Sequence, residues 1–304
     1  MGEKTKIEWC DKTFNPWRGC LKCATGCQNC YAEATSKRNQ KTLGVWGSEK
    51  SGATRVVASE DMWAQPFKWN EAARRYNIEQ GFDEYSYGMI KRPRVFCASL
   101  ADIFEDWKGP MIGHWGQDPN LWGWDQPVRM VDVRARLFAL VRITHELDWL
   151  LLTKRPENIP RFMPVRPFKN VWLGTSIACQ DDIRNADILS ESRRLCAKTF
   201  LSIEPLIGPV DVTRGERPDW LIIGGESGPN ARPCNVDWIR DIVQSCKTAN
   251  VPVFVKQLGS FPFKENQRTL SSATEKLPRI KLADRKGGYM DEWPEDLRIR
   301  EFPR

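Results

Sequence analysis

The sequence predicts an α/β fold, a partial TIM-like β/α barrel of parallel strands. Short apolar segments alternate along the chain with amphipathic helical patterns, which is typical of parallel β/α units. The apolar segments are RVFCASLADIF (94–104), DWLLLTKRP (148–156), VWLGTSI (171–177), TFLSIEPL (199–206), DWLIIGGESG (219–228) and VPVFVKQLG (251–259). With TFNPWRG (13–19) as a first strand and its exit, about seven strands are expected, enough for a barrel or part of one.

Helical patterns separate several of these strands, because apolar residues recur there three and four positions apart. They are VDVRARLFALVRITHEL (131–147), QDDIRNADILSESRRLCA (180–197) and VDWIRDIVQSCKTAN (236–250), and YAEATSKRNQKTL (31–43) is also helical in character. We expect residues 1–260 to form the barrel, with 44–92 as an insertion of loops and short helices after the first β/α unit. Residues 261–304 are expected to form an irregular C-terminal segment, with a short strand or two, that caps the barrel.

Composition favours a globular, cytoplasmic protein. Hydrophobic residues make up 41% of the 304 residues, and the polar start MGEKTKIEWCDK has no apolar stretch of the kind a signal peptide needs. No apolar run reaches the about 18 residues of a membrane span, so no membrane partner is expected. Six isolated cysteines are expected to be buried free thiols in a reducing compartment, and they are Cys10, Cys97, Cys179, Cys196, Cys234 and Cys246.

The net charge of +7 suits a partner that carries phosphate. The chain also has 14 tryptophans, several of them beside Pro, Gly or charged residues, where they would either stack on nucleic-acid bases or pack loops onto the barrel. These are Trp17, Trp46, Trp63, Trp107, Trp115, Trp122 and Trp124.

Four cysteines lie in one short loop, at Cys20, Cys23, Cys27 and Cys30. Thiolates this close in sequence are typical of a [4Fe–4S] cluster, and three of them would leave one iron open to a small ligand. A structural zinc site is the alternative, but zinc motifs usually have two separated pairs or histidines, and the only histidines are His114 and His145. A disulfide framework is less favoured in a long chain that has no signal peptide.

Polar residues end nearly every apolar segment, and in a β/α barrel those ends converge on the face that carries active sites. The cysteine loop follows the first strand and would open onto the same face. The residues are Ser99 and Asp102, Thr153 to Arg155, Thr175 and Ser176, Ser202 and Glu204, Gly224 to Ser227, and Lys256 with Gln257.

Three thiolates at the top of such a barrel resemble the radical S-adenosylmethionine (SAM) enzymes, whose C-x3-C-x2-C spacing and following aromatic residue match Cys23, Cys27, Cys30 and Tyr31. Blocks from residue 5 to the C-terminus are similar to the phage-associated three-Cys-motif family of radical SAM-like proteins. Among them are TKIEWCDKTFNPWRGC, GCQNCYAE, RVFCASLADIFED, DWLIIGGESGPNARP and DRKGGYMDEWPEDLR. That family's C-x6-C-x2-C spacing selects Cys20, Cys27 and Cys30 instead. The first ligand is therefore Cys20 or Cys23, and the NPWRGC block favours Cys20.

The resemblance implies a [4Fe–4S] cluster, SAM, an electron donor such as flavodoxin or ferredoxin, and a phage protein in a bacterial host cell. Barrel geometry then suggests cofactor-binding roles, with Ser99 and Asp102 on the SAM ammonium and Gly225 letting adenine approach the backbone, near Glu226. Thr175, Ser176 and Glu204 would bind the ribose hydroxyls or the SAM carboxylate region, and Tyr31 completes the cofactor set.

Three cations suit an anionic substrate such as a nucleotide or DNA phosphate, and they are assigned catalytic roles: Lys154, Arg155 and Lys256. Alternatively, Lys154 and Arg155 pair with Glu204 or Glu226. Modification of a nucleobase in phage DNA is the leading expectation. Radical chemistry on a metabolite or protein is the second, and a non-catalytic nucleic-acid-binding protein with a structural metal is the third.

Overall fold

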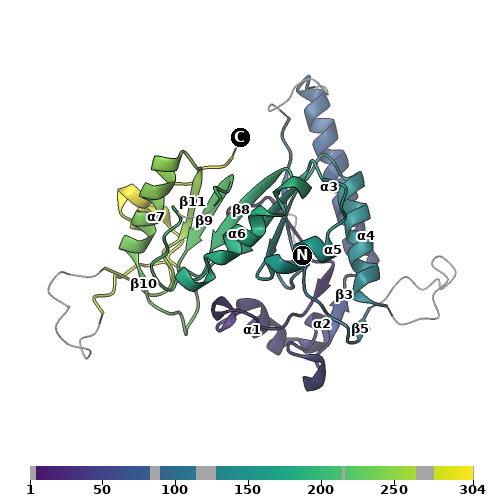
Figure 1. Cartoon of the computed structure of the whole chain (residues 1–304), viewed down its shortest axis with the longest axis horizontal. Helices are drawn as coiled ribbons and strands as arrows, with labels where there is room; N and C mark the ends of the chain where they lie inside the picture. Colours follow the sequence, from purple (N-terminus) through teal and green to yellow (C-terminus); the bar gives the residue numbers. More distant parts are fainter. Residues whose placement is uncertain (1–4, 83–89, 114–127, 214–215, 265–276, 304) are drawn as a thin grey trace. The chain divides into compact units, whose positions relative to one another are not determined.

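The computed structural model describes residues 5–82, 90–113, 128–213, 216–264 and 277–303, and its fold is mixed α/β (Figure 1). Each apolar segment expected to be a strand forms one. The strands are β1 (Lys12–Phe14), β4 (Arg94–Cys97), β6 (Asp148–Thr153), β7 (Val171–Ser176), β8 (Lys198–Ile203), β9 (Trp220–Gly224) and β11 (Val253–Gln257).

The chain divides into two compact units. Unit 1 comprises Met1–Cys23, Cys30–Leu173 and Ser192–Lys198, and unit 2 comprises Ala24–Asn29, Gly174–Glu191 and Thr199–Arg304. The hydrogen-bonded strand order is β1-β4-β6-β7 in unit 1 and β7-β8-β9-β11 in unit 2, because β7 belongs to both. This division runs through β7, whereas the sequence led us to expect a boundary near residue 260.

In unit 1, β1, β4 and β6 pair in parallel, with Phe14 opposite Cys97 and Cys97 opposite Leu151. Most residues of β4 and β6 are buried, as expected for parallel strands covered on both faces, whereas in β1 only Phe14 is buried. The unit also contains a small sheet of β2 (Trp17–Arg18), β3 (Arg55–Val57) and β5 (Met111–Ile112). Its helices are α1 (Tyr31–Arg38), α2 (Gln40–Leu43), α3 (Glu60–Glu79), α4 (Met130–Ile143) and α5 (Ile159–Phe162), with 3-10 turns at η2 (Glu49–Ser51), η3 (Pro156–Asn158) and η5 (Arg193–Leu195).

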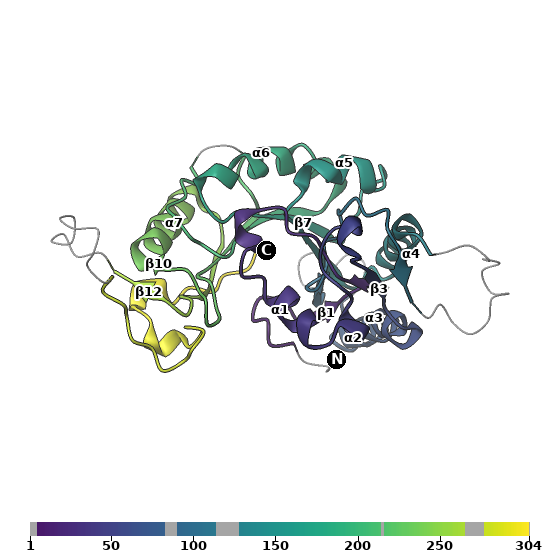
Figure 2. The ribbon, with the colours of Figure 1, turned by 90° about the horizontal axis from the view of Figure 1, so that it is seen from below.

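Helix α3 corrects the expectation of short helices in the insertion, because it is one continuous helix of 20 residues. Pro66 lies in its first half and removes one backbone donor, yet its ring is buried on the same face as Trp63. Packing offsets the lost hydrogen bond: the Arg136 guanidinium lies 4.3 Å from the Trp63 ring and forms an ion pair with Glu60. Helices α3 and α4 therefore run side by side, as Figures 1 and 2 show.

In unit 2, β8, β9 and β11 also pair in parallel, with Ile203 opposite Ile223 and Ile223 opposite Val255. The helices are α6 (Arg184–Ser190) and α7 (Val236–Ala249), with 3-10 turns at η1 (Thr25–Cys27), η4 (Gln180–Asp182), η6 (Met290–Glu292) and η7 (Glu295–Leu297). A two-stranded sheet joins β10 (Cys234–Asn235) to β12 (Pro262–Phe263).

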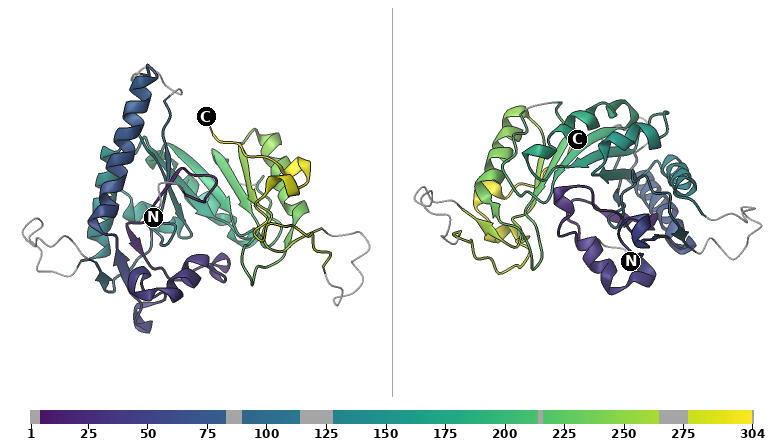
Figure 3. Two further views of the ribbon diagram at one scale, coloured as in Figure 1. Left: turned by 180° about the vertical axis from the view of Figure 1, so that it is seen from behind. Right: turned by 60° about the horizontal axis from the view of Figure 1, so that its bottom comes forward.

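The C-terminal residues are irregular, as expected, and they lie alongside α7 (Figure 3). Arg240 of α7 forms an ion pair with Asp296, and isolated bridges join Phe254 to Arg300 and Phe263 to Arg279. Trp293 and Leu297 are buried, so this segment contributes to the core of unit 2.

Burial decides between the two interpretations of the tryptophans for those that the structure describes. Trp17, Trp63 and Trp107 are buried in the core, so base stacking is wrong for these three, and Trp17 and Trp63 belong to β2 and α3 and not to loops. Trp46 is partly exposed, and Trp115, Trp122 and Trp124 lie outside the described residues. Positive charge remains as the support for a nucleic-acid partner.

The isolated cysteines are mostly buried, as expected for Cys10, Cys97, Cys234 and Cys246, but Cys179 and Cys196 are partly exposed. None of the helices in the described ranges combines the length and apolarity that a membrane span needs.

Candidate metal and cofactor site

The chain enters the cysteine loop through a tight turn at Gly19. Its φ of +103° is a left-handed conformation, and a Cβ there would lie 2.7 Å from the Thr54 carbonyl oxygen and 3.0 Å from Cδ of Arg55. The Gly19 N–H donates to the carbonyl of Leu100 at 3.0 Å. Only glycine fits this conformation and this space, so the residue before Cys20 is fixed by packing.

None of the four loop cysteines is part of a disulfide. Cys23 is exposed, whereas Cys20, Cys27 and Cys30 are partly exposed, and Cys27 is the one that belongs to unit 2. Within the described ranges, no three His, Cys, Asp or Glu side chains form a group that could hold a metal ion. The donor chemistry itself fits an iron–sulfur cluster, because accessible thiols in one short loop are the ligands that iron takes in such clusters.

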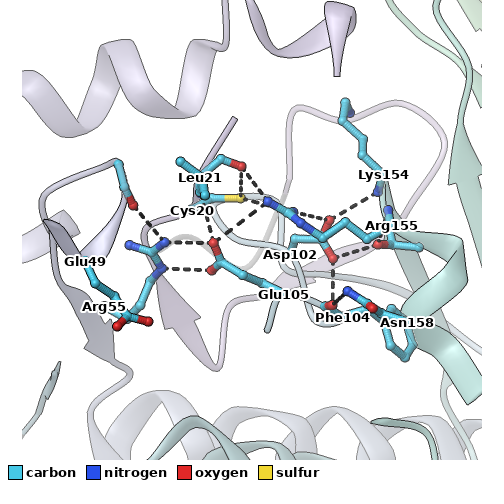
Figure 4. Close-up of polar contacts among 12 residues, drawn as sticks. Cys20, Leu21, Glu49, Arg55, Asp102, Phe104, Glu105, Lys154, Arg155 and Asn158 are labelled. Atoms are coloured by element: carbon cyan, nitrogen blue, oxygen red, sulfur yellow. Dashed lines mark hydrogen bonds and ion pairs between the residues drawn. The ribbon is translucent and has the colours of Figure 1, made fainter. Parts of the chain in front are cut away.

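Arg155 connects the start of the loop to the end of β6 (Figure 4). Its Nη1 lies 3.8 Å from the Cys20 sulfur and 3.0 Å from Oδ2 of Asp102, and its Nη2 donates to the Leu21 carbonyl at 2.6 Å. A guanidinium that donates to a sulfur favours the thiolate form, which is the form that binds metal. The Cys20 thiol is thereby held against a cation.

Asp102 is buried, and its carboxylate accepts four hydrogen bonds from within unit 1. Oδ1 accepts from the Phe104 N–H at 2.9 Å and the Thr153 hydroxyl at 2.7 Å, and Oδ2 accepts from the Lys154 N–H at 3.1 Å and from Arg155. A carboxylate accommodates about four donors. The assignment of Asp102 to the SAM ammonium stays a prediction, while the geometry favours a role in orienting Arg155.

The ion-pair partner of Arg155 corrects an expectation. The alternative to substrate binding was pairing with Glu204 or Glu226, but Arg155 pairs with Asp102, 3.0 Å away, and also approaches Glu105 at 3.9 Å. The reason is register: β4 and β6 are adjacent and parallel, so the residues that follow them lie at the same edge of the sheet. The Lys154 side chain is partly exposed, while its backbone N–H donates to Asp102.

Glu105 and Arg55 complete this cluster, and the sequence analysis did not single them out. Two parallel contacts join them, Nε to Oε2 at 2.8 Å and Nη2 to Oε1 at 2.7 Å, and both side chains are buried. Glu105 Oε1 also accepts from the Leu21 N–H at 3.0 Å, and the Arg55 guanidinium lies 3.7 Å from the Trp107 ring. In the sequence, the one signal for Glu105 was its acidic side chain close behind Asp102.

Burial and charge act together on the groups around Cys20. Burial and the nearby carboxylates of Glu105 and Asp102 raise the pKa of the Cys20 thiol well above its ordinary value, and Arg155 partly offsets this. Burial alone would lower the pKa of Arg155, but Asp102 and the Cys20 and Cys23 sulfurs raise it instead. Arg155 therefore remains a cation beside the loop.

Tyr31 and Ser99 lie together in unit 1. The exposed Tyr31 donates its hydroxyl to the Ser99 carbonyl at 2.7 Å. The Ser99 hydroxyl contacts the amide of Asn15, whose Nδ2 donates to it at 3.1 Å, and the Asn15 oxygen accepts from the Leu100 N–H at 2.7 Å. Asn15 is fully buried and fixes the backbone where the two predicted cofactor residues meet.

In unit 2, the predicted residues Glu204 and Lys256 form an ion pair. The Lys256 ammonium lies 3.0 Å from Oε1 of Glu204, and the Ser202 hydroxyl donates to the other carboxylate oxygen at 3.5 Å. Thr175 and Ser176, at the end of β7, are buried. Glu204 directly follows β8 and Lys256 lies near the end of β11, so this ion pair joins residues at the ends of two strands.

Packing against backbone accounts for Gly225. A Cβ at this position would lie 2.2 Å from the Leu258 carbonyl oxygen, so no larger residue fits even without a ligand. The missing side chain therefore needs no adenine to explain it. The role of Gly225 in adenine binding stays a prediction without support from this contact.

Glu226 is part of a second cluster, which holds residues of the cysteine loop within unit 2. Arg232 makes charged contacts with both Glu226 oxygens, at 2.6 and 2.9 Å, and its Nη1 donates to the Thr25 carbonyl at 3.0 Å. Asn29 donates to Glu226 Oε2 at 3.0 Å and to the Asn230 carbonyl at 2.7 Å. Burial would raise the pKa of Glu226, but the hydrogen bonds from Arg232 and Asn29 lower it. Sequence reasoning missed Arg232 and Asn29.

Comparison with known proteins gives one match. No curated protein and no solved structure matches the chain. A family model described as "Protein of unknown function (DUF5131)" matches residues 4–109 and 124–285, which is most of the chain. The protein therefore belongs to the DUF5131 family.

Proposed function

We propose that the protein is a radical SAM enzyme of the phage-associated three-Cys-motif family, acting in the cytoplasm of a bacterial host. It would hold a [4Fe–4S] cluster on three cysteines of the loop and cleave SAM to a 5′-deoxyadenosyl radical. The consecutive order of parallel strands supports a partial β/α barrel as the scaffold. When bound, the cluster supplies the electron that cleaves SAM, and a flavodoxin or ferredoxin would deliver it.

The observation that carries the proposal is the environment of Cys20. Its sulfur lies 3.8 Å from the Arg155 guanidinium, at the end of the parallel strands where barrel enzymes carry their active sites. This contact favours Cys20, with Cys27 and Cys30, as the ligand set, and leaves Cys23 as the exposed extra thiol.

The remaining predicted residues keep their proposed roles. Ser99 and Tyr31 are proposed to contact SAM, and Thr175, Ser176 and Glu204 are proposed to bind its ribose hydroxyls or carboxylate region. Arg155 pairs with Asp102, and Lys256 pairs with Glu204, so both act on a substrate only by exchanging these partners.

The proposed substrate is a nucleobase or nucleotide in phage DNA, and the net charge of +7 supports it. DNA affinity should then fall steeply as salt rises, because each neutralised phosphate releases counterions. If no salt-sensitive binding to DNA is found, a small metabolite or protein is favoured as the substrate. DNA binding by a protein that never cleaves SAM would favour a non-catalytic binder with a structural metal.

The test is formation of 5′-deoxyadenosine after anaerobic reconstitution with iron and sulfide, followed by a reductant and SAM. Cys27→Ala and Cys30→Ala should abolish the product, while Cys196→Ala, a partly exposed cysteine outside the loop, should leave it unchanged. Cys20→Ala should abolish it and Cys23→Ala should retain it. Activity that survives Cys27→Ala would overturn the proposal, and the reverse result for Cys20 and Cys23 would exchange the first ligand.

A further inference from the structure

The segment that follows β4 is held from several sides within unit 1. Arg134 of α4 donates to the Ile103 carbonyl at 2.9 Å and to the Glu105 carbonyl at 2.7 Å, and Asn158 donates to the Phe104 carbonyl at 2.9 Å. Arg134 is itself buried. The backbone around Glu105 is therefore held by hydrogen bonds that do not involve the Glu105 side chain, which contacts the cysteine loop at Leu21.

Both polar groups of the Leu21 backbone end on this fixed segment or on Arg155. The Leu21 N–H donates to Glu105 Oε1 at 3.0 Å, and the Leu21 carbonyl accepts from Arg155 Nη2 at 2.6 Å (Figure 4). The Leu21 side chain is exposed, so apolar packing contributes little to its position. Polar contacts to buried charges therefore hold the residue that follows Cys20.

The charges in this cluster balance, since two guanidinium groups face two carboxylates. Arg55 is fully buried, pairs with Glu105 through two contacts, and also donates to the Thr54 carbonyl at 3.0 Å and the Gly47 carbonyl at 3.3 Å. Gly47 in turn donates its N–H to the Cys20 carbonyl at 3.1 Å. Arg55 thus braces Glu105 and also reaches the residue that binds the backbone of Cys20.

We infer that Arg55 and Glu105 are positioning residues for the Cys20 thiol, acting through the backbone of Leu21. This inference rests on the proposed function, in which Cys20 is the first ligand of the cluster and must be held at a defined place. Groups that hold a metal ligand in place without touching the metal orient that ligand, and their loss lowers metal affinity by about tenfold or more. Neither residue touches the thiol: Glu105 acts through the hydrogen bond from Leu21, and Arg55 acts by holding Glu105 and the Gly47 carbonyl.

Two double variants of the full chain separate this hydrogen bond from the ion pair. Removing one member of a buried pair leaves an uncompensated charge, so both members are replaced together. Arg55→Met with Glu105→Leu removes the acceptor for the Leu21 N–H. Arg55→Met with Glu105→Gln removes the charges but keeps a side-chain oxygen at that place. Methionine also keeps a contact with the Trp107 ring.

The first readout is hydrogen–deuterium exchange of the Leu21 amide in metal-free protein. Exchange should speed up about tenfold in the Met/Leu variant and change little in the Met/Gln variant, because only the former loses the bond. The Gly19 amide, which donates to Leu100, should be unaffected in both and reports on the fold. Unchanged protection of Leu21 in the Met/Leu variant would overturn the inference.

The second readout is iron affinity during anaerobic reconstitution. It should fall about tenfold in the Met/Leu variant and stay near the wild-type value in the Met/Gln variant. Loss of Leu21 protection without loss of iron affinity would also overturn the inference. If the wild-type protein took up no cluster, the proposed function would fail, whereas the exchange experiment would still decide whether Glu105 holds Leu21.

Discussion

Two carboxylates and two guanidinium groups lie within contact distance of one another beside Cys20. Buried charges are costly unless they are paired and hydrogen-bonded, and here Asp102, Glu105, Arg55 and Arg155 satisfy both conditions. The pairing explains why polar residues at strand ends are buried, although solvent or ligand contact was expected for them. These four residues would therefore influence a ligand indirectly, through the backbone and side chains that they hold in place.

Asp148 at the start of β6 gives a prediction on pH. Burial raises its pKa from 3.8 to about 6, and Arg92, Lys198 and a hydrogen bond from Trp172 only partly offset this. The folded state then binds the proton more tightly than the unfolded state, so the contribution of Asp148 to stability is fully present only below about pH 3.8. It is lost as pH rises through about 6.

Asp148→Asn should therefore raise the free energy of unfolding at pH 7 by about 1 to 2 kcal/mol and leave it nearly unchanged at pH 4. Urea unfolding at the two pH values measures the difference. A variant that is less stable than the wild type at pH 7 would show that the attraction of Arg92 and Lys198 outweighs the cost of burial.

The close approach of backbone atoms at Gly225 gives a second prediction for a single residue. Gly225→Ala should destabilise the protein by about 1 to 3 kcal/mol in the absence of any ligand, because the new Cβ meets the Leu258 carbonyl. Gly208→Ala is the matched control, since the nearest atom to its Cβ is 3.7 Å away. Full stability of Gly225→Ala together with weakened SAM binding would instead favour the adenine role.

At the scale of elements, strand register decides which side chains meet. The parallel pairing of β4 with β6 brings Asp102 to Arg155, and that of β8 with β9 and of β9 with β11 orders the ends that carry Glu204 and Lys256. Sequence periodicity identified these strands because buried parallel strands are short and almost wholly apolar. It did not identify α3 as one helix, because Pro66 interrupts the pattern while its ring packs in the core.

The C-terminal end of α7 gives a prediction on the free energy of unfolding. Asn250 follows the helix with φ of 54° and ψ of 43°, and its N–H donates to the carbonyls of Cys246 and Lys247. Asn and Gly adopt this left-handed conformation at lower cost than other residues. Asn250→Ala should lower the free energy of unfolding by about 1 kcal/mol, whereas Asn250→Gly should not lower it. Equal stability of the two variants in thermal unfolding would contradict this account of the helix end.

At the scale of the whole molecule, the sequence sufficed for the seven strands of the large sheet and for the position of the cysteine loop in the chain. It singled out Asp102 and Arg155 as residues at strand ends, but not their pairing with each other. The pairing of Arg55 with Glu105 could not be predicted either, because Arg55 lies on β3, whose place depends on pairing with β2 and β5. Two-residue strands such as β2 and β5 leave no periodic pattern that would predict their register.

Electron paramagnetic resonance of the reduced, iron-reconstituted protein, before and after addition of SAM, tests whether the cysteine loop holds a cluster that binds SAM. We predict a [4Fe–4S]⁺ signal that changes when SAM is added, because SAM would bind at the open iron. Tightly bound zinc, with no signal that responds to SAM, would contradict this prediction and would favour a structural metal in the cysteine loop.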